Sequence, residues 1–256
     1  MASTSDNAFA GEGLLKARVE DAVRLCGRRD TPVFIGFLDA SERAAAEGMV
    51  RPFRDVTTRF WGGHEEGERT LLGVFPSFME ADPTWFPLTE IGFTYRTEAS
   101  ITHRDVLGSL LATGIRREML GDILCAPGLS VVFVKDELVS FLQEQVTKIG
   151  GEGVQIHMPF EGTLPAAHTF RELRDTVASP RLDAVLRVCL STSREEAARR
   201  IATGIVSVNH RPCLSASTEV KAGDVLSVRG AGRFRVEQVG PQTRKGRLFI
   251  TINQYV

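Results

Sequence analysis

Apolar residues recur along this chain with two different periods, and the changes of period mark the expected elements. Helical spacing over residues 12–29 comes first, followed by the short apolar run TPVFIGFL and an alanine-rich stretch for which Ser41 is the expected N-cap. A hairpin is predicted next, because the β-prone runs TTRFWGG and RTLLGVF flank the charged loop HEEGE. Residues 1–76 are therefore expected to form an N-terminal α/β domain.

A connector rich in proline and aromatic residues follows, and after it the pattern becomes sharper. Four β-prone runs and two helical stretches succeed one another in the order β-α-β-β-α-β. The strands are expected at 91–95, 122–125, 130–134 and 154–158, and the helices at 103–113 and 136–148. This order predicts a ferredoxin-like split βαβ domain over residues 77–160, and RNA-recognition-motif (RRM) domains have the same order.

The last third of the chain begins with residues 161–178, which are expected to be a linker containing one extended piece, HTFRELRDTV. The final segment, 179–256, opens with a helix for which Ser179 is the expected N-cap and Pro180 the first helical residue. A second helix is expected to begin after Ser193, and short strands follow it. The predicted fold class is α+β and multidomain: an N-terminal α/β unit, a ferredoxin-like (RRM-like) middle domain and a C-terminal domain of helices and strands.

Composition limits the class of protein. The chain is 43% hydrophobic and 25% charged, as is ordinary for a globular protein with real cores. It has no run of 18 apolar residues and no basic, apolar leader, so neither a membrane span nor a secretory signal is expected. The four cysteines are far apart and show no CxxC spacing, which favours a cytoplasmic protein over a disulfide framework or a zinc site.

The net charge of −1 hides an asymmetry. Residues 179–256 hold 13 Lys and Arg against 6 Asp and Glu, whereas residues 1–178 hold 18 basic and 26 acidic residues. Such a split favours a polyanionic partner for the basic segment, the alternative being a solvated surface with chance clustering. We interpret the acidic N-terminal domain as a spacer or a protein-contact module, because RNA would repel it.

Motifs of known catalytic and metal centres are missing from the sequence. It lacks a GxSxG elbow, a Walker A loop and an HExxH motif, and its GAGRFR string lacks the third glycine of a dinucleotide fingerprint. The five histidines are isolated from one another in sequence. We therefore expect no catalytic residue, no metal ligand and no cofactor. An RNA-modifying enzyme with an unrecognised pocket in the first 160 residues stays open as an alternative.

The basic segment carries a resemblance to a known family between Arg181 and Gly230. It holds R-L-D at the start of the first helix, S-R-x-x-A at the second, G-x-V-x-V-N in a hairpin, and then V-x-x-G-D-x-x-x-V-R. This segment resembles the small RNA-binding domain named after ribosomal protein S4. The resemblance implies an S4-type (αL) fold for the C-terminal domain and structured RNA as its partner.

One residue of the hairpin departs from the family pattern. The family usually places Gly after the hairpin Asn, and His210 stands there in this chain. A two-residue type I′ turn needs positive φ at both central positions, a region that Asn and His tolerate better than most residues. We expect a slightly strained turn at Asn209 and His210.

Ten residues of the C-terminal segment are predicted to bind RNA, eight of them within the stretch that resembles the S4 domain. Cations on the two helices and the hairpin are expected to follow a phosphate backbone, since structured RNA is recognised mainly by shape and backbone. Arg233 and Arg235, which follow the matched segment, are expected to continue the same basic strip. The predicted RNA-binding residues are Arg181, Ser193, Arg194, Arg199, Arg200, Asn209, Lys221, Arg229, Arg233 and Arg235.

A second resemblance covers the middle of the chain. The stretch from His103 to Leu142 contains the gapped signature GSLL-GI-RE-GDI, and the order of the three domains extends the match over residues 12–256. The chain resembles the YlmH family of bacterial RNA-binding proteins. This resemblance implies a non-catalytic factor, expected to be monomeric, that binds rRNA and tRNA on the large (50S) ribosomal subunit in ribosome-associated quality control of stalled nascent chains. A cell-division-linked adaptor is a further alternative.

Aromatic residues of the middle domain raise the question of a second RNA contact. RRM sheets stack bases on aromatic side chains of their central strands. Here Phe93 and Tyr95 share one face of the first predicted strand, and Phe133 lies on the third, which is otherwise aliphatic. We interpret Phe93 and Tyr95 as core residues and not as a platform for bases.

Overall fold

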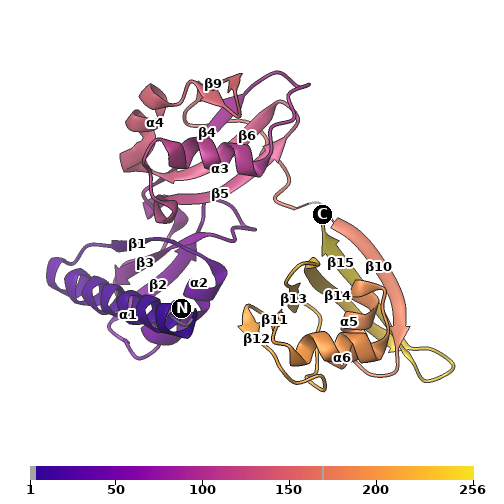
Figure 1. The fold of residues 1–256 in the computed structure, drawn as a ribbon. Helices are drawn as coiled ribbons and strands as arrows, with labels where there is room; N and C mark the ends of the chain where they lie inside the picture. The colour runs from indigo at the N-terminus through magenta and orange to yellow at the C-terminus, as the bar shows by residue number, and fades with distance from the viewer. Residues whose placement is uncertain (1–3, 169) are drawn as a thin grey trace. The chain divides into compact units, whose positions relative to one another are not determined.

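The computed structural model describes residues 4–168 and 170–256, with side chains from residue 12 onward. The chain divides into two compact units, Met1–Ala167 and His168–Val256, each with its own buried core (Figure 1). Among the helices of the described residues, none is long and apolar enough to cross a membrane. The four cysteines are free thiols.

The first unit begins with a three-stranded antiparallel sheet in the order β1-β3-β2. Its elements are α1 (Thr4–Arg29), β1 (Val33–Leu38), α2 (Ala40–Val50), β2 (Val56–Trp61) and β3 (Thr70–Pro76). The predicted hairpin around HEEGE is confirmed, because β2 pairs with β3 along its whole length. Apolar side chains of both helices, among them Val19 and Ala46, form one core with Leu72 and Val74 of β3.

Helix α2 begins with a different N-cap from the one predicted. Asp39, and not Ser41, caps it: one Asp39 carboxylate oxygen accepts the backbone N–H groups of Ser41 and Glu42, each at 2.9 Å. Glu42 completes a capping box by accepting the backbone N–H of Asp39 at 2.8 Å. A carboxylate is also favoured at the positive end of the helix dipole, which explains why the aspartate takes the cap.

The second sheet of this unit has four antiparallel strands in the order β5-β6-β4-β9. The elements of this part are η1 (Pro83–Trp85), β4 (Leu88–Thr94), α3 (His103–Ala112), η2 (Arg117–Met119), β5 (Leu120–Ala126), β6 (Leu129–Lys135), η3 (Asp136–Leu138), α4 (Val139–Gln145), β7 (Lys148–Ile149), β8 (Glu152–Gly153) and β9 (Gln155–His157). The first and third strands of the predicted β-α-β-β-α-β series are central, which matches a ferredoxin-like arrangement.

Both faces of this four-stranded sheet are covered. On one face α3 and α4 pack through Val106, Leu110 and Leu142 over strand residues that include Phe93. On the other face Phe133 lies in a cluster with aromatic and aliphatic side chains of β1 and β3. The two sheets of the first unit therefore share a core across a boundary that was expected to separate two domains.

The second unit is built on a six-stranded antiparallel sheet in the order β10-β15-β14-β13-β11-β12 (Figure 1). Its elements are β10 (Phe170–Val177), α5 (Leu182–Leu190), α6 (Arg194–Ala202), β11 (Val206–Val208), β12 (Arg211–Pro212), β13 (Val225–Val228), β14 (Gly232–Gln242) and β15 (Leu248–Tyr255). The S4-type order of two helices followed by a hairpin is present, and β10, β14 and β15 enlarge its sheet.

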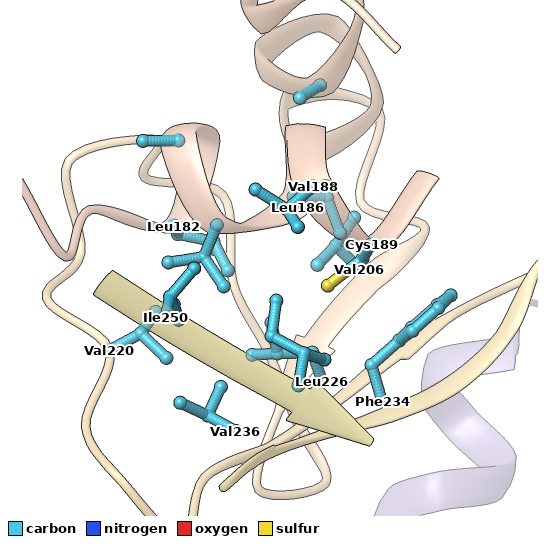
Figure 2. Packing of buried hydrophobic residues seen from close by; sticks show 14 of the residues in the cluster. Leu182, Leu186, Val188, Cys189, Val206, Val220, Leu226, Phe234, Val236 and Ile250 are labelled. Atoms are coloured by element: carbon cyan, nitrogen blue, oxygen red, sulfur yellow. The ribbon is translucent and has the colours of Figure 1, made fainter. Parts of the chain in front are cut away.

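Helices α5 and α6 cover one side of this sheet. Figure 2 shows Leu182, Leu186 and Cys189 of α5 above the strand residues Leu226 and Ile250. Each fully buried aliphatic side chain of this kind stabilises the fold by about 1.5–3 kcal/mol. The sequence alternation in β14 is decisive for the site described below. Phe234 and Val236 enter this core, so Arg233 and Arg235, which alternate with them, cannot.

The start of this unit differs from the prediction in two ways. The extended piece of the expected linker is β10, which pairs with β15 from Phe170 to Val177 and so belongs to the sheet. The N-cap of α5 is Arg181, and not Ser179. No side chain caps this helix, because backbone carbonyl groups of the loop at residues 216–218 accept its first two N–H groups.

Candidate nucleic-acid interface

A buried carboxylate at the start of α5 positions two of the predicted RNA-binding arginines. Asp183 accepts hydrogen bonds from Arg194 Nε at 2.9 Å and from Arg181 Nε at 3.3 Å, and a further bond from the backbone N–H of Ala184 at 2.9 Å. The two guanidinium groups stay about half exposed while the carboxylate is buried. Arg181 and Arg194, which are distant in sequence, are thus held side by side.

The charge of Asp183 is secured by the same contacts. Burial alone would raise the pKa of Asp183, but the hydrogen bonds and positive charges of Arg194 and Arg181 outweigh burial and leave the pKa lowered. The carboxylate is therefore ionised at neutral pH, and it fixes both arginines without neutralising their outward-facing edges.

Helix α6 begins at one predicted residue, Ser193, and exposes two others, Arg199 and Arg200, to different extents. Ser193 is its N-cap, as predicted, and its hydroxyl accepts the backbone N–H of Glu196 at 3.1 Å. The Glu196 carboxylate binds Arg200 Nε at 3.0 Å and Arg199 Nη2 at 3.2 Å, and these contacts lower the pKa of Glu196. The Arg199 side chain is 74% exposed and that of Arg200 only 37%. Arg199 is the more available of the two for a phosphate.

The hairpin after β11 has the predicted strained turn. Asn209 and His210 have φ values of 47° and 65°, so both central residues are left-handed as a type I′ turn requires. The Asn209 amide donates to Asp224 Oδ1 at 2.8 Å and accepts the backbone N–H of Val225 at 2.9 Å. Both ends of this side chain are thus used inside the protein, and Asn209 acts as a clamp between two turns.

Lys221 lies beside that clamp, whereas Arg229 lies at the other end of β13, where its backbone N–H donates to the carbonyl oxygen of Ile205. Both side chains are exposed. Asp224 accepts the backbone N–H of Lys221 at 2.7 Å, which orders the turn without engaging the ammonium group. Within residues 12–168 and 170–256, neither side chain forms an ion pair. Their predicted contact with RNA stays a prediction.

Arg233 and Arg235 lie on a different surface from the helical arginines, and this corrects the prediction of one continuous strip. Phe234 and Val236 point into the core beneath α5 and α6, so their neighbours in β14 point to the opposite side of the sheet. Arg233 stacks over the Tyr255 ring at 4.5 Å, and Arg235 pairs with Glu237 at 3.9 Å. We call this opposite side of the sheet the open face.

Three residues that matter for the site were not predicted. Asp183, Glu196 and Asp224 are acidic and are therefore absent from the predicted set of RNA-binding residues, yet each one anchors members of that set. A signal was present for two of them, because Asp183 belongs to the R-L-D motif and Asp224 to the V-x-x-G-D motif.

The first unit holds a polar cluster that joins residues distant in sequence. Asp122 of β5 accepts the backbone N–H groups of Glu68 and Arg69 at 2.8 and 3.0 Å, and His64 Nε2 lies 3.0 Å from it. These contacts fasten the loop between β2 and β3 to the second sheet. Nearby, burial and the charge of Arg69 lower the pKa of Arg117 to about 10. This polar cluster therefore stabilises the packing of the two sheets against each other.

Possible metal ligands and the aromatic residues of the middle sheet are the other candidate functional groups. In the part of the chain that the structure describes, no three His, Cys, Asp or Glu side chains are placed to hold a metal ion. Phe93 is fully buried, and Tyr95 is partly buried with its hydroxyl 2.8 Å from Ser130 Oγ. The interpretation of Phe93 as a core residue is confirmed.

Comparisons with known proteins identify the middle and C-terminal regions. Residues 86–160 match the family described as "Putative RNA-binding domain in YlmH", and residues 180–226 match the S4 domain. A curated protein of Bacillus subtilis (strain 168), "Ribosome-associated protein quality control protein P2", is 29% identical over 220 residues, which is 85% of this chain and 85% of that protein.

A solved structure gives a matching fold. The cell division protein YlmH from Streptococcus pneumoniae superposes with a TM-score of 0.50 at 16% identity, covering 62% of this chain and 93% of that one. At this identity the likeness concerns the fold alone. The chain therefore contains a domain that matches the RNA-binding domain of YlmH and, after it, an S4 domain, and it is similar over most of its length to a ribosome-associated quality control protein.

Proposed function

We propose that this protein is a non-catalytic factor that binds rRNA and tRNA on the large (50S) ribosomal subunit during quality control of stalled nascent chains. The name of the Bacillus subtilis relative supports the pathway, and its association with ribosomes would place this chain in the cytoplasm. The S4 match supports RNA as the ligand.

The observation that carries this proposal is the cationic group on the helical side of the second unit. Arg181 and Arg194 are held by Asp183, and Arg199 projects from the next helical turn. Holding the guanidinium groups before RNA arrives reduces the side-chain entropy that binding costs. Structured RNA is recognised through backbone and shape, which suits two half-exposed guanidinium groups held by a carboxylate and a third that is largely exposed. We include Lys221 in the same interface, whereas Arg229 follows the buried Val228 and lies on the opposite side of the sheet.

The test is co-sedimentation of the full chain with separated ribosomal subunits over a series of salt concentrations. The wild type is compared with an Arg194→Gln/Arg199→Gln variant, which removes two charges without placing a new carboxylate beside Asp183. We expect salt-sensitive binding to the large subunit, with the variant weaker and its log–log salt slope smaller by about 1.5.

An Arg28→Gln/Arg29→Gln variant is the matched control, because it removes the same charge from an exposed pair at the end of α1. It should bind like the wild type. Equal weakening of both variants would mean that net charge, and not the helical arginines, governs binding. Absence of wild-type binding to either subunit would contradict the proposal.

A further inference from the structure

The open face of the second unit carries a row of side chains that crosses five strands. Pairing aligns Ser207 of β11 with Ser227 of β13, Ser227 with Arg233 of β14, and Tyr255 of β15 with Phe170 of β10. The contact of Arg233 with the Tyr255 ring joins the two halves of the row. With strands about 4.8 Å apart, four steps extend the row over roughly 19 Å.

One end of this row is aromatic. The Phe170 and Tyr255 rings meet edge to face with their centroids 5.0 Å apart, and His168 meets Tyr255 at 4.8 Å in the same manner. Phe170 is 41% exposed even though it is a large apolar residue. An aromatic ring that stays partly in water, supported from the side by other rings, is a surface on which a planar group can stack.

The other end of the row is a polar, cationic hollow of about 470 Å³. Its lining includes Ser207, His210, Ser227, Arg229 and Arg233, and no carboxylate occurs among the described residues that line it. The glycines at 204, 230 and 232 have positive φ, so the backbone bends around the hollow with no side chain to fill it. Hydroxyl and guanidinium groups around an open space suit a phosphate.

We propose that the open face binds a short single-stranded RNA segment, with bases stacked on Phe170 and Tyr255 and backbone phosphates in the hollow at Arg229 and Arg233. This rests on the proposed function in taking RNA as the ligand, but it uses the side of the sheet opposite to the helical arginines. A sheet that carries exposed aromatics can hold two or three bases, and the row has the length for that number.

Charge and ring geometry favour RNA over a peptide as the occupant. A peptide would need unpaired strand edges or an apolar groove, whereas every backbone position in the centre of this row is already paired within the sheet. Arg233 serves both ends, since it lines the hollow and stacks over Tyr255. A cation beside an aromatic ring is the combination that single-stranded nucleic acid uses for its phosphates and bases.

The experiment measures fluorescence anisotropy of a labelled, unstructured ten-nucleotide RNA with the full chain. Phe170→Ala is the main variant, and Tyr255→Leu is the second, which keeps apolar bulk in case the sheet needs it. Losing one base stack should weaken binding roughly 5- to 150-fold. Phe249→Ala is the matched control, since Phe249 is 52% exposed on the same strand as Tyr255 but lies six residues, about 20 Å, away.

Selective weakening by Phe170→Ala and Tyr255→Leu, with large-subunit binding retained, would support the proposal. Crosslinking of a 4-thiouridine oligonucleotide to peptides of β10 or β15 would support it independently. Unchanged oligonucleotide binding in both variants would overturn it, and so would loss of binding only in Arg194→Gln/Arg199→Gln. If Phe170→Ala altered ribosome binding but not oligonucleotide binding, the open face would be a protein contact and the proposal would fail.

Discussion

The middle sheet and the C-terminal sheet differ in what lies on their second face. The four-stranded sheet has the strand order of a domain type that often binds RNA, yet Phe93 is buried under its helices and Phe133 is buried against the neighbouring sheet. The six-stranded sheet has helices on one side, and its other side presents Arg233, Tyr255 and Phe170. Strand order alone therefore does not make a sheet an RNA platform, because the neighbours of each face decide.

Close packing against the middle sheet explains why its second face is unavailable. A Cβ atom added at Gly63 would come within 2.2 Å of the Phe133 ring, and one added at Gly121 within 2.6 Å of the Phe37 ring. Backbone and rings are therefore in direct contact, and a nucleobase has no space there. The aromatic residues of this face are used for stability.

The strongest way to break the contrast is to truncate one phenylalanine on each sheet. Phe133→Ala should lower the free energy of unfolding by about 3–5 kcal/mol, because it empties a buried site between two sheets. Phe249→Ala deletes the same ring from an exposed position and should cost less than about 1 kcal/mol. Urea unfolding followed by circular dichroism compares the two. Similar losses would show that the C-terminal face is also covered in solution.

The next largest effect is expected for Asp183→Asn, which should weaken binding on the helical side of the C-terminal sheet and leave binding on its open face unchanged. Removing the carboxylate leaves Arg181 and Arg194 without their anchor and should cost about 1–3 kcal/mol of stability. Large-subunit binding should weaken, whereas binding of a single-stranded oligonucleotide should not change. A variant with wild-type large-subunit affinity would show that the anchor does not organise the interface.

The pH dependence of this variant has a definite sign. Because the folded-state pKa of Asp183 is lowered, its contribution to stability is present above the unfolded-state value of about 4 and is lost as pH falls through the folded-state value. The stability difference between wild type and Asp183→Asn should therefore be full at pH 7 and should shrink below about pH 4. Thermal unfolding across this range measures it, and a difference that grew with acid would contradict the assignment.

A smaller effect ranks the two arginines of α6. Arg199→Gln should weaken large-subunit binding about two- to fivefold, as expected for one exposed charged contact. Arg200→Gln should have less effect, since Arg200 is more shielded and is bound closely by Glu196. Sedimentation titrations of the two single variants compare them directly. The reverse order would place the RNA on the other flank of the helix.

The smallest expected change is a stabilisation at the hairpin. His210→Gly relieves a left-handed conformation that costs a non-glycine residue about 1 kcal/mol, and the added chain entropy of glycine offsets part of this gain. We expect a net increase of about 0.5 kcal/mol in the free energy of unfolding. A lowered melting temperature would mean that the imidazole makes a contribution that outweighs the strain.

Local patterns in the sequence were sufficient for much of this architecture. The hairpin around HEEGE, the Ser193 cap and the strained turn at Asn209 each depend on residues close together in the chain. The interpretation of Phe93 as a core residue followed from the mostly aliphatic third strand of the same predicted sheet. The alternation of apolar and polar residues in β14 also indicates that Arg233 faces away from the helices. A count of charges along a segment does not distinguish the two faces of a strand, so the prediction placed Arg233 with the helical arginines.

The remaining features depend on partners that are distant in sequence. Arg181 replaces Ser179 as the N-cap because loop carbonyl groups more than 30 residues later satisfy the helix. The aromatic end of the open face exists only once the register of β10 with β15 is known. Neither propensity nor spacing supplies such a register, since any strand of suitable length satisfies the local pattern.

The position of β15 between β10 and β14 has a consequence for how this chain is made. Among the strands that the structure describes, β10 pairs with β15 alone, and the ribosome must add the 70 residues from 178 to 247 before β15 begins. During that interval β10 has no partner strand, while the two helices and the hairpin can already pack together. The second unit is therefore completed late in translation, and its open face forms only after its helical side has been synthesised.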